Sequence, residues 1–286
     1  MIEFKQVSKS FRRARVLDGI NLQLGLGERV ALIGSNGAGK TTLIRCLLGE
    51  YTHDGQVLIG GHDPRQERTT VLAGVGFVPQ LPPPLKMPVG QLINFAAALC
   101  GTPPARVHAL AARLGLDLAG ILARPFNRLS GGMKQKLLIA IALGRDAKVL
   151  VMDEPAANLD PQARKIFFEL LAERADSTTM LISSHRINEV SSLVNRVVEL
   201  DMGKVVLDET LAQDSLLTGL CTARVVCRQA EPALAKALSA WGFTAMDETG
   251  TVWQGTVPGP DRLRFLGMVS RYVAVISDVS LQEAQP

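Results

Sequence analysis

The chain has 286 residues, 47% of them apolar, which is enough for one large domain with a substantial core and a second, small domain. Its 31 basic and 27 acidic residues leave a net charge of +4 without a Lys/Arg block, so nothing in the charge indicates a nucleic-acid partner. The four cysteines have no Cys-x-x-Cys spacing, which indicates reduced thiols of a cytosolic protein and no cysteine metal site.

No membrane-spanning or secretory segment is expected. Residues 1–5 contain no charged-then-apolar leader, and the longest apolar stretches, such as residues 137–143, fall far short of the ~18 residues that a transmembrane helix needs. If the protein drives transport, the membrane path must then belong to another polypeptide.

Strand-like segments come first, at residues 2–5, 21–24, 29–33 and 57–59, with Gly-rich turns between them. They suit an antiparallel edge beside the main sheet. The apolar run 29–33 is followed by Gly34-Ser35-Asn36-Gly37-Ala38-Gly39-Lys40-Thr41, which matches the phosphate-binding pattern G-x-x-x-x-G-K-[ST].

The glycines of this loop allow backbone N–H groups to point at phosphate oxygens, and a helix from about residue 40 to 48 adds its N-terminal dipole. We expect Lys40 to reach the β- and γ-phosphates, Thr41 to supply a hydroxyl to Mg²⁺, and Thr42 to bond a more distal phosphate. A plain Gly-rich turn is the alternative.

The next segments change character. A strand at 75–79 precedes Gln80, and residues 81–88 contain four prolines, which excludes helix or central strand there. Residues 89–128 show helical spacing of apolar residues. The proline segment is expected to be a stiff surface stretch that contacts a partner, or else a solvent-exposed linker.

Residues 148–155 form an apolar strand that ends in Asp153 and Glu154 and is stopped by proline. An acidic residue at the carboxyl end of a buried parallel strand lies where ligands bind in open α/β sheets, so Asp153 can hold Mg²⁺ through water. Glu154 can orient and polarise an attacking water. The alternative is that the pair only caps a loop.

Leu129-Ser130-Gly131-Gly132-Met133 precedes this strand, and with the phosphate loop the order resembles the ATP-binding cassette (ABC) family over roughly residues 2–210. The segment is similar to the family's LSGGQ signature, with Met133 in place of Gln, as in ABC-2 type exporters. The resemblance implies an α/β P-loop NTPase fold, an ABC nucleotide-binding domain whose core sheet has an antiparallel edge and a helical subdomain at about 85–135.

The resemblance also implies roles for single residues. Ser130, Gly131 and Gly132 would clasp the γ-phosphate held by a second subunit, as a serine-capped helix start can. Gln80 would touch Mg²⁺ or the water, and is otherwise an ordinary loop residue. His185, after the strand 179–184, would contact the γ-phosphate and support Glu154, although a lone histidine is usually structural.

Two further residues carry open alternatives. Asp160 resembles the D-loop aspartate of the dimer interface, and it also suits a helix N-cap before Pro161. Phe11 resembles the aromatic residue that stacks on adenine, but a phenylalanine ending an apolar strand is often a core residue.

The cassette is expected to span residues 1–212, after strands at 196–200 and 204–207. Residues 213–286 read as strand 222–228, helix 231–241, strands 243–247 and 251–257, helix 260–270 and strand 273–278. This β-α-β-β-α-β order predicts a small α+β domain of the ferredoxin-like plan. We expect it to serve as a dimerisation or docking module, with ligand sensing as the alternative.

These features together predict an ATPase that binds ATP and Mg²⁺ between two copies of the chain. We expect the closing homodimer to drive a separate integral membrane permease at the cytoplasmic face of the inner membrane, in ABC-2 type export or an envelope process. The alternative is a soluble ABC ATPase, for example of iron–sulfur cluster assembly, against which the extra C-terminal domain argues.

Overall fold

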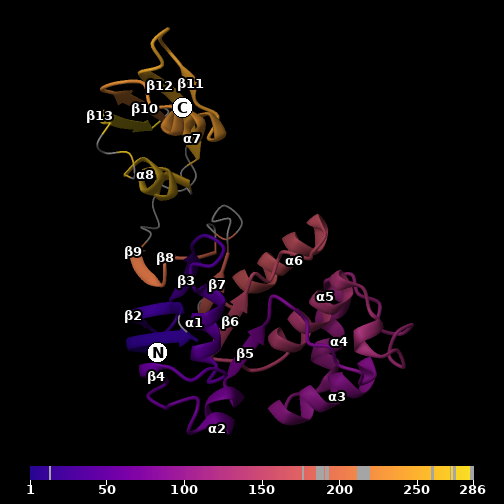
Figure 1. Ribbon diagram of the computed structural model, residues 1–286. Helices are drawn as coiled ribbons and strands as arrows, with labels where there is room; N and C mark the ends of the chain where they lie inside the picture. Colours follow the sequence, from indigo (N-terminus) through magenta and orange to yellow (C-terminus); the bar gives the residue numbers. More distant parts are fainter. Residues whose placement is uncertain are drawn as a thin grey trace. The chain divides into compact units, whose positions relative to one another are not determined.

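A computed structural model describes residues 1–12, 14–175, 177–184, 190, 193–210, 220–258, 261–270, 272 and 275–283. Contacts divide the chain into two compact units, Met1–Leu211 and Ala212–Pro286 (Figure 1). Within these described ranges, no helix is both long and apolar enough to span a membrane. Each unit is described by itself below.

A six-stranded sheet forms the centre of the first unit, in the order β5-β6-β7-β3-β8-β9. Neighbouring strands are parallel except for the antiparallel pair β8 and β9. The strands are β3 (Arg29–Ile33), β5 (Val75–Val78), β6 (Val149–Asp153), β7 (Thr179–Ser183), β8 (Arg196–Asp201) and β9 (Lys204–Thr210). The segment 29–33 therefore belongs to the parallel sheet and not to an antiparallel edge.

The central strands are buried on both faces, which explains their continuous apolar sequence. Along β6, Val149 and Val151 point into one hydrophobic core, while Leu150 and Met152 point into the other. The alternation follows from the two-residue period of a strand. Because both faces are covered, polar side chains can be placed only at the strand ends.

The first core lies under an antiparallel sheet of order β2-β1-β4 and the helix α1 (Lys40–Leu47). Its strands are β1 (Ile2–Phe11), β2 (Ala14–Leu24) and β4 (Asp54–Ile59), each longer than the sequence predicts. A short helix, α2 (Arg68–Ala73), precedes β5.

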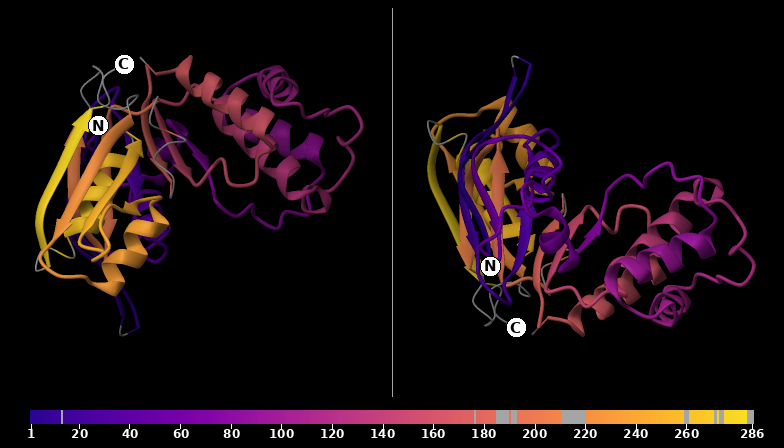
Figure 2. Two further views of the ribbon diagram at one scale, coloured as in Figure 1. Left: turned by 90° about the horizontal axis from the view of Figure 1, so that it is seen from above. Right: turned by 90° about the horizontal axis from the view of Figure 1, so that it is seen from below.

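The second core joins the other face of the central sheet to helices. Helices α3 (Val89–Cys100), α4 (Pro104–Arg113) and α5 (Gly131–Leu143) lie side by side, as the two views of Figure 2 also show, and a 3-10 turn, Phe126–Arg128, precedes α5. Helix α6 (Pro161–Ala172) follows β6. The fully buried Phe126 and Leu137 anchor this group.

The second unit contains β10 (Leu220–Cys227), α7 (Pro232–Ala240), β11 (Thr244–Ala245), β12 (Val252–Pro258), α8 (Arg262–Ser270) and β13 (Ile276–Glu283). Its antiparallel sheet has the order β11-β12-β10-β13, and Phe265 stacks on Phe243 in its core. The strand expected at 273–278 begins at Ile276 and runs to Glu283. We infer a ferredoxin-like domain from the element order.

Candidate nucleotide-binding site

The phosphate-type loop joins the carboxyl end of β3 to the start of α1. Gly34, Gly37 and Gly39 have φ angles of 147°, 86° and 109°, in a region that favours glycine. At Gly34 a Cβ atom would lie 2.3 Å from the carbonyl oxygen of Leu200, so only glycine fits there. Ser35, Asn36 and Gly37 are exposed, whereas Ala38 and Gly39 are buried.

Lys40 is folded back into this loop. Its ammonium donates to the carbonyl oxygens of Gly34 (2.7 Å) and Ser35 (3.1 Å). Burial lowers the pKa of Lys40, while the charges of Glu154 and Asp153 oppose that shift, so the lysine and both carboxylates interact electrostatically. Thr41 and Thr42 follow, half-buried, on the first turn of α1. The loop and the acidic strand end thus meet at one edge of the sheet.

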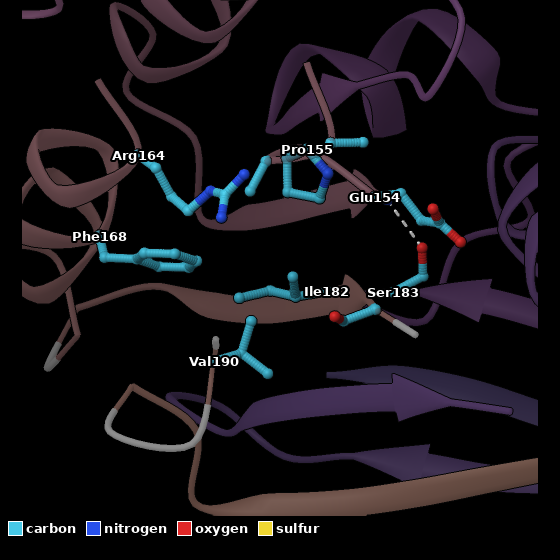
Figure 3. A pocket seen from close by; sticks show the side chains of 10 residues that line it. Glu154, Pro155, Arg164, Phe168, Ile182, Ser183 and Val190 are labelled. Carbon is cyan, nitrogen blue, oxygen red and sulfur yellow. Dashed lines mark hydrogen bonds between the residues drawn. The ribbon is translucent and has the colours of Figure 1, made fainter. Parts of the chain in front are cut away.

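Asp153 is buried at the end of β6, with 3% exposure. The Ser183 hydroxyl donates to Asp153 Oδ1 at 2.6 Å. Glu154 has a φ of 46°, and its N–H donates to Ser183 Oγ (2.9 Å) and to the Ser183 carbonyl oxygen (3.2 Å) (Figure 3). Ser183 belongs to none of the motifs that predict a role for a site residue. Its only signal was a hydroxyl in a strand that is otherwise mostly apolar.

A cavity of about 240 Å³ adjoins Glu154, between the turn after β6, the end of β7 and α6 (Figure 3). Arg164 and Phe168 of α6 line one side, and Ile182 and Val190 line another. The volume is below roughly 300 Å³, the low end for pockets that enclose a drug-sized ligand. A nucleotide is therefore not enclosed in this cavity, and no residue of the phosphate loop lines it.

The segment resembling the signature begins α5. Ser130 is the N-cap, and its Oγ accepts from the Met133 N–H at 3.3 Å. Ser130 and Gly131 are exposed, and a Cβ on Gly132 would lie 3.2 Å from the Asn158 carbonyl oxygen. The helix start is thus open to solvent on one side and close to the loop before Asp160 on the other.

Asp160 is the N-cap of α6, as one of the two alternatives expects. Its Oδ1 accepts from the Ala163 N–H at 2.9 Å, and its Oδ2 pairs with Lys136 Nζ at 2.8 Å. The hydrogen bond from Lys136 holds the pKa of Asp160 below its usual value. The pair ties α5 to the start of α6.

Gln80 is half-buried and comes two residues after the end of β5, whose parallel neighbour β6 ends in Asp153. Phe11 is 40% exposed and packs edge-on against Tyr51, with ring centroids 5.2 Å apart, so it is not a core residue. His185 lies outside the described residues. It follows β7, the strand beside β6.

Known proteins resemble this chain in sequence and in fold. The family model described as "ABC transporter" matches residues 17–157. The Nod factor export ATP-binding protein I of Paraburkholderia xenovorans is 37% identical over 221 residues, which cover 72% of this chain and 70% of that protein. The chain belongs to the ABC transporter family.

Other relatives match to a similar degree. The methionine import ATP-binding protein MetN of Caulobacter vibrioides is 35% identical, with 81% of this chain and 73% of that protein covered. The nickel import ATP-binding protein NikO of Rhodobacter capsulatus is 35% identical, with 75% and 92% covered. A solved ATP-binding subunit of an ABC transporter superposes with a TM-score of 0.67 at 27% identity, covering 74% of this chain and 90% of that one.

Family membership confirms the nucleotide-binding cassette fold predicted from the sequence. It also makes this chain an ATP-binding ATPase subunit of the ABC type. The solved structure of a bacterial Atm1-family ABC exporter with ATP bound is similar to this chain, with 26% identity and a TM-score of 0.66. The match covers 73% of this chain and 38% of the exporter chain.

Proposed function

We propose that this cassette energises a separate membrane permease by ATP-driven closure of a homodimer, in ABC-2 type export or an envelope process. The observation that carries the proposal is the convergence of Lys40, Asp153 and Glu154 at one sheet edge, beside an exposed, serine-capped helix start. Lys40, Asp153 and Glu154 form a site for the phosphates and the attacking water, and the serine-capped helix start is a second anion site that faces outward.

The phosphate side of the site follows from the loop. The amides of residues 34–39 and the Lys40 ammonium bind the β- and γ-phosphates, and Thr42 bonds a further phosphate oxygen. Lys40 is already desolvated among carbonyl oxygens, which favours its exchange onto a more strongly negative phosphate.

The residues near Asp153 also fit Mg²⁺. Asp153 Oδ2 makes no hydrogen bond to the described part of the chain, while Oδ1 is held by Ser183. With the Thr41 hydroxyl and the Gln80 amide oxygen, this is the all-oxygen donor set that Mg²⁺ prefers. When bound, Mg²⁺ would neutralise charge on the phosphates during transfer.

Glu154 orients the attacking water, and His185 supports it from the end of β7. The positive φ of Glu154 is unusual for a residue with a Cβ, and such strain is found at sites that fix a side chain for function. Phe11 presents an exposed ring on which adenine stacks.

A second copy completes the site. Ser130, Gly131 and Gly132 of one copy bind the γ-phosphate held by the other, and Asp160 lies at the interface. The exposure of Ser130 and Gly131 supports this arrangement, because unpaired amides at a helix start attract an anion.

The permease contact is assigned to the proline segment after Gln80. Leu81 is 76% exposed, and Leu85 and Met87 are each 36% exposed. The carbonyl oxygens of Leu85 and Met87 accept from Asn127 and Phe126, directly before the signature. Motion of Gln80 can therefore reach a membrane partner and the signature through one segment. We place the protein at the cytoplasmic face of the inner membrane.

Relatives named for export and for import match at 37% and 35% identity, so identity does not set the direction of transport. Export is proposed from the Met-bearing signature and from the similarity of residues 183–190 to ABC-2 type cassettes. Transport itself is favoured over iron–sulfur assembly, since these relatives are named as export or import ATP-binding proteins.

Glu154→Gln tests the catalytic assignment. We expect ATP turnover to fall about 10²-fold or more, because the water loses its general base. With MgATP the variant should form a stable dimer, measured by light scattering after size exclusion. Lys40→Ala is the control that should neither bind ATP nor dimerise. Normal turnover by the Glu154→Gln variant would show that the residue has been misassigned.

Purification of tagged protein from detergent-solubilised membranes tests the partner. A polytopic membrane protein should elute with the wild-type chain. If the tagged chain elutes without such a partner and all of it is found in the membrane-free fraction, the result would support the soluble ATPase instead.

A further inference from the structure

Ser183 connects the two acidic residues of the site. It is the last residue of β7, has no exposed surface, and lies opposite Asp153 in the parallel register of β6 and β7. Its hydroxyl donates to Asp153 Oδ1 at 2.6 Å. It also accepts from the Glu154 N–H at 2.9 Å (Figure 3). One oxygen atom therefore bridges a carboxylate and the backbone of the next residue.

The surroundings of Ser183 show that packing alone does not require a hydroxyl. The preceding residues Leu181 and Ile182 are also fully buried and apolar. A buried hydroxyl is unfavourable unless it is hydrogen-bonded, and both partners of Ser183 belong to the acidic turn. Its polarity is thus directed entirely at Asp153 and Glu154.

The two hydrogen bonds have different consequences. The bond to Oδ1 fixes the plane of the Asp153 carboxylate and leaves Oδ2 to other ligands. The bond from the Glu154 N–H, together with the one to the Ser183 carbonyl oxygen at 3.2 Å, holds Glu154 at its φ of 46°. A backbone in this region persists only when neighbouring contacts fix it.

We propose that Ser183 is a positioning residue that couples the Mg²⁺-binding orientation of Asp153 to the water-orienting position of Glu154. This inference rests on the roles proposed above for those two residues. Residues that orient the ligands of a metal act through a hydrogen bond of this kind, and their loss typically lowers metal affinity or activity ~10–100-fold.

Ser183→Ala removes the hydroxyl, and Ser183→Thr retains it. Thr179→Val is the matched control, because Thr179 is a buried hydroxyl at the other end of β7 that donates to Gly25 O (3.2 Å) and accepts from Gly27 N–H (3.0 Å). Ser183→Ala and Thr179→Val each remove the two hydrogen bonds that a hydroxyl of β7 makes, but only Ser183→Ala affects the acidic turn.

Three quantities are measured for each variant: affinity for a fluorescent ATP analogue in EDTA, the same affinity in Mg²⁺, and the Mg²⁺ concentration that half-activates turnover. For Ser183→Ala we expect unchanged affinity in EDTA, a half-activating Mg²⁺ concentration raised ~10-fold, and turnover lowered ~10-fold or more. Ser183→Thr should restore turnover and Mg²⁺ dependence, and Thr179→Val should keep the wild-type Mg²⁺ dependence.

The inference is overturned if Ser183→Ala and Thr179→Val respond alike to Mg²⁺, since Ser183 would then only stabilise the strand. If Ser183→Ala does not fold, Ser183→Cys replaces it, because a thiol is a weaker donor of similar shape. Wild-type Mg²⁺ dependence in that variant also overturns the inference. Normal turnover of Glu154→Gln would instead refute the role proposed above for Glu154, on which this inference rests.

Discussion

Replacing Gln135 of α5 should change the stability of the fold, because this residue contacts the turn after β6. Gln135 has no exposed surface, and its Nε2 donates to the Pro155 carbonyl oxygen at 2.9 Å. Its Oε1 is buried without a hydrogen-bond partner among the described residues. Gln135→Leu leaves the Pro155 oxygen unsatisfied, at a cost of about 1–3 kcal/mol, but it also removes the unsatisfied Oε1, a gain of similar size. The net change in stability should be within about 1 kcal/mol.

Gln135→Glu should behave differently, and its effect should depend on pH. A neutral carboxyl can still donate to Pro155, but ionisation in this buried position is unfavourable, so the pKa of the new group is raised in the folded state. A raised carboxyl pKa costs stability above the unfolded value of about 4.3, by about 1.4 kcal/mol for each pH unit. If the carboxyl stays neutral in the folded state throughout this range, the cost is about 1 kcal/mol at pH 5 and about 4 kcal/mol at pH 7.

Thermal unfolding of the first unit at pH 5 and pH 7 measures both effects. For a unit of 211 residues, about 1 kcal/mol corresponds to roughly 2–4 °C in Tm. The Tm of the Gln135→Glu variant should therefore lie roughly 8–16 °C below that of the wild type at pH 7. Gln162→Glu, an exposed position on α6, is the control without a pH-dependent difference. Equal Tm values for the Leu and Glu variants at pH 7 would refute the buried contact with Pro155.

Two further predictions concern the phosphate-type loop and Asp160, the N-cap of α6. Gly34→Ala should lower the Tm strongly, because the added Cβ clashes with the backbone. At Gly37 an added Cβ meets no atom within 4 Å, so Gly37→Ala should lower the stability of the fold by only about 1–2 kcal/mol, for the positive φ. Gly37→Ala should still lose ATP binding in a fluorescence titration. Full affinity in Gly37→Ala would contradict the assigned loop. Asp160→Asn keeps a good N-cap but loses the ion pair with Lys136, which lowers the pKa of Asp160. The ion pair stabilises the fold at pH values above the ordinary carboxyl pKa of about 4. This stabilisation is lost as the pH falls through the lower pKa that Asp160 has in the folded state. Urea midpoints of variant and wild type should therefore differ at pH 7 and converge once the pH falls below the lowered pKa of the folded state, and a difference that is constant with pH would contradict this.

The amino-acid sequence was sufficient for the parts of the molecule that depend on local chemistry. The loop of residues 34–41 is one contiguous stretch in which glycine conformation and the following helix define the anion site. The strand ending at Asp153 is equally local, because a run of apolar residues stopped by proline has few other structures. The family resemblance then placed both in the cassette fold.

Strand ends and pairings were less predictable, because they depend on partners far along the chain. The segment 29–33 reads like its neighbours, but it pairs with β7 and β8 in the parallel sheet. The strand β13 continues to Glu283 because β10 offers a hydrogen-bonding partner as far as Cys221. Local propensity does not contain this information.

Only the tertiary structure could show which side chains hold the acidic turn. Ser183 lies 30 positions from Asp153, and Gln135 lies 20 positions from Pro155. Neither pair leaves a pattern in the sequence, because a side-chain hydrogen bond needs only that two atoms meet in space. The chain thus specifies its nucleotide loop locally, whereas the geometry of the turn that carries Asp153 and Glu154 arises from the packing of β6, β7 and α5.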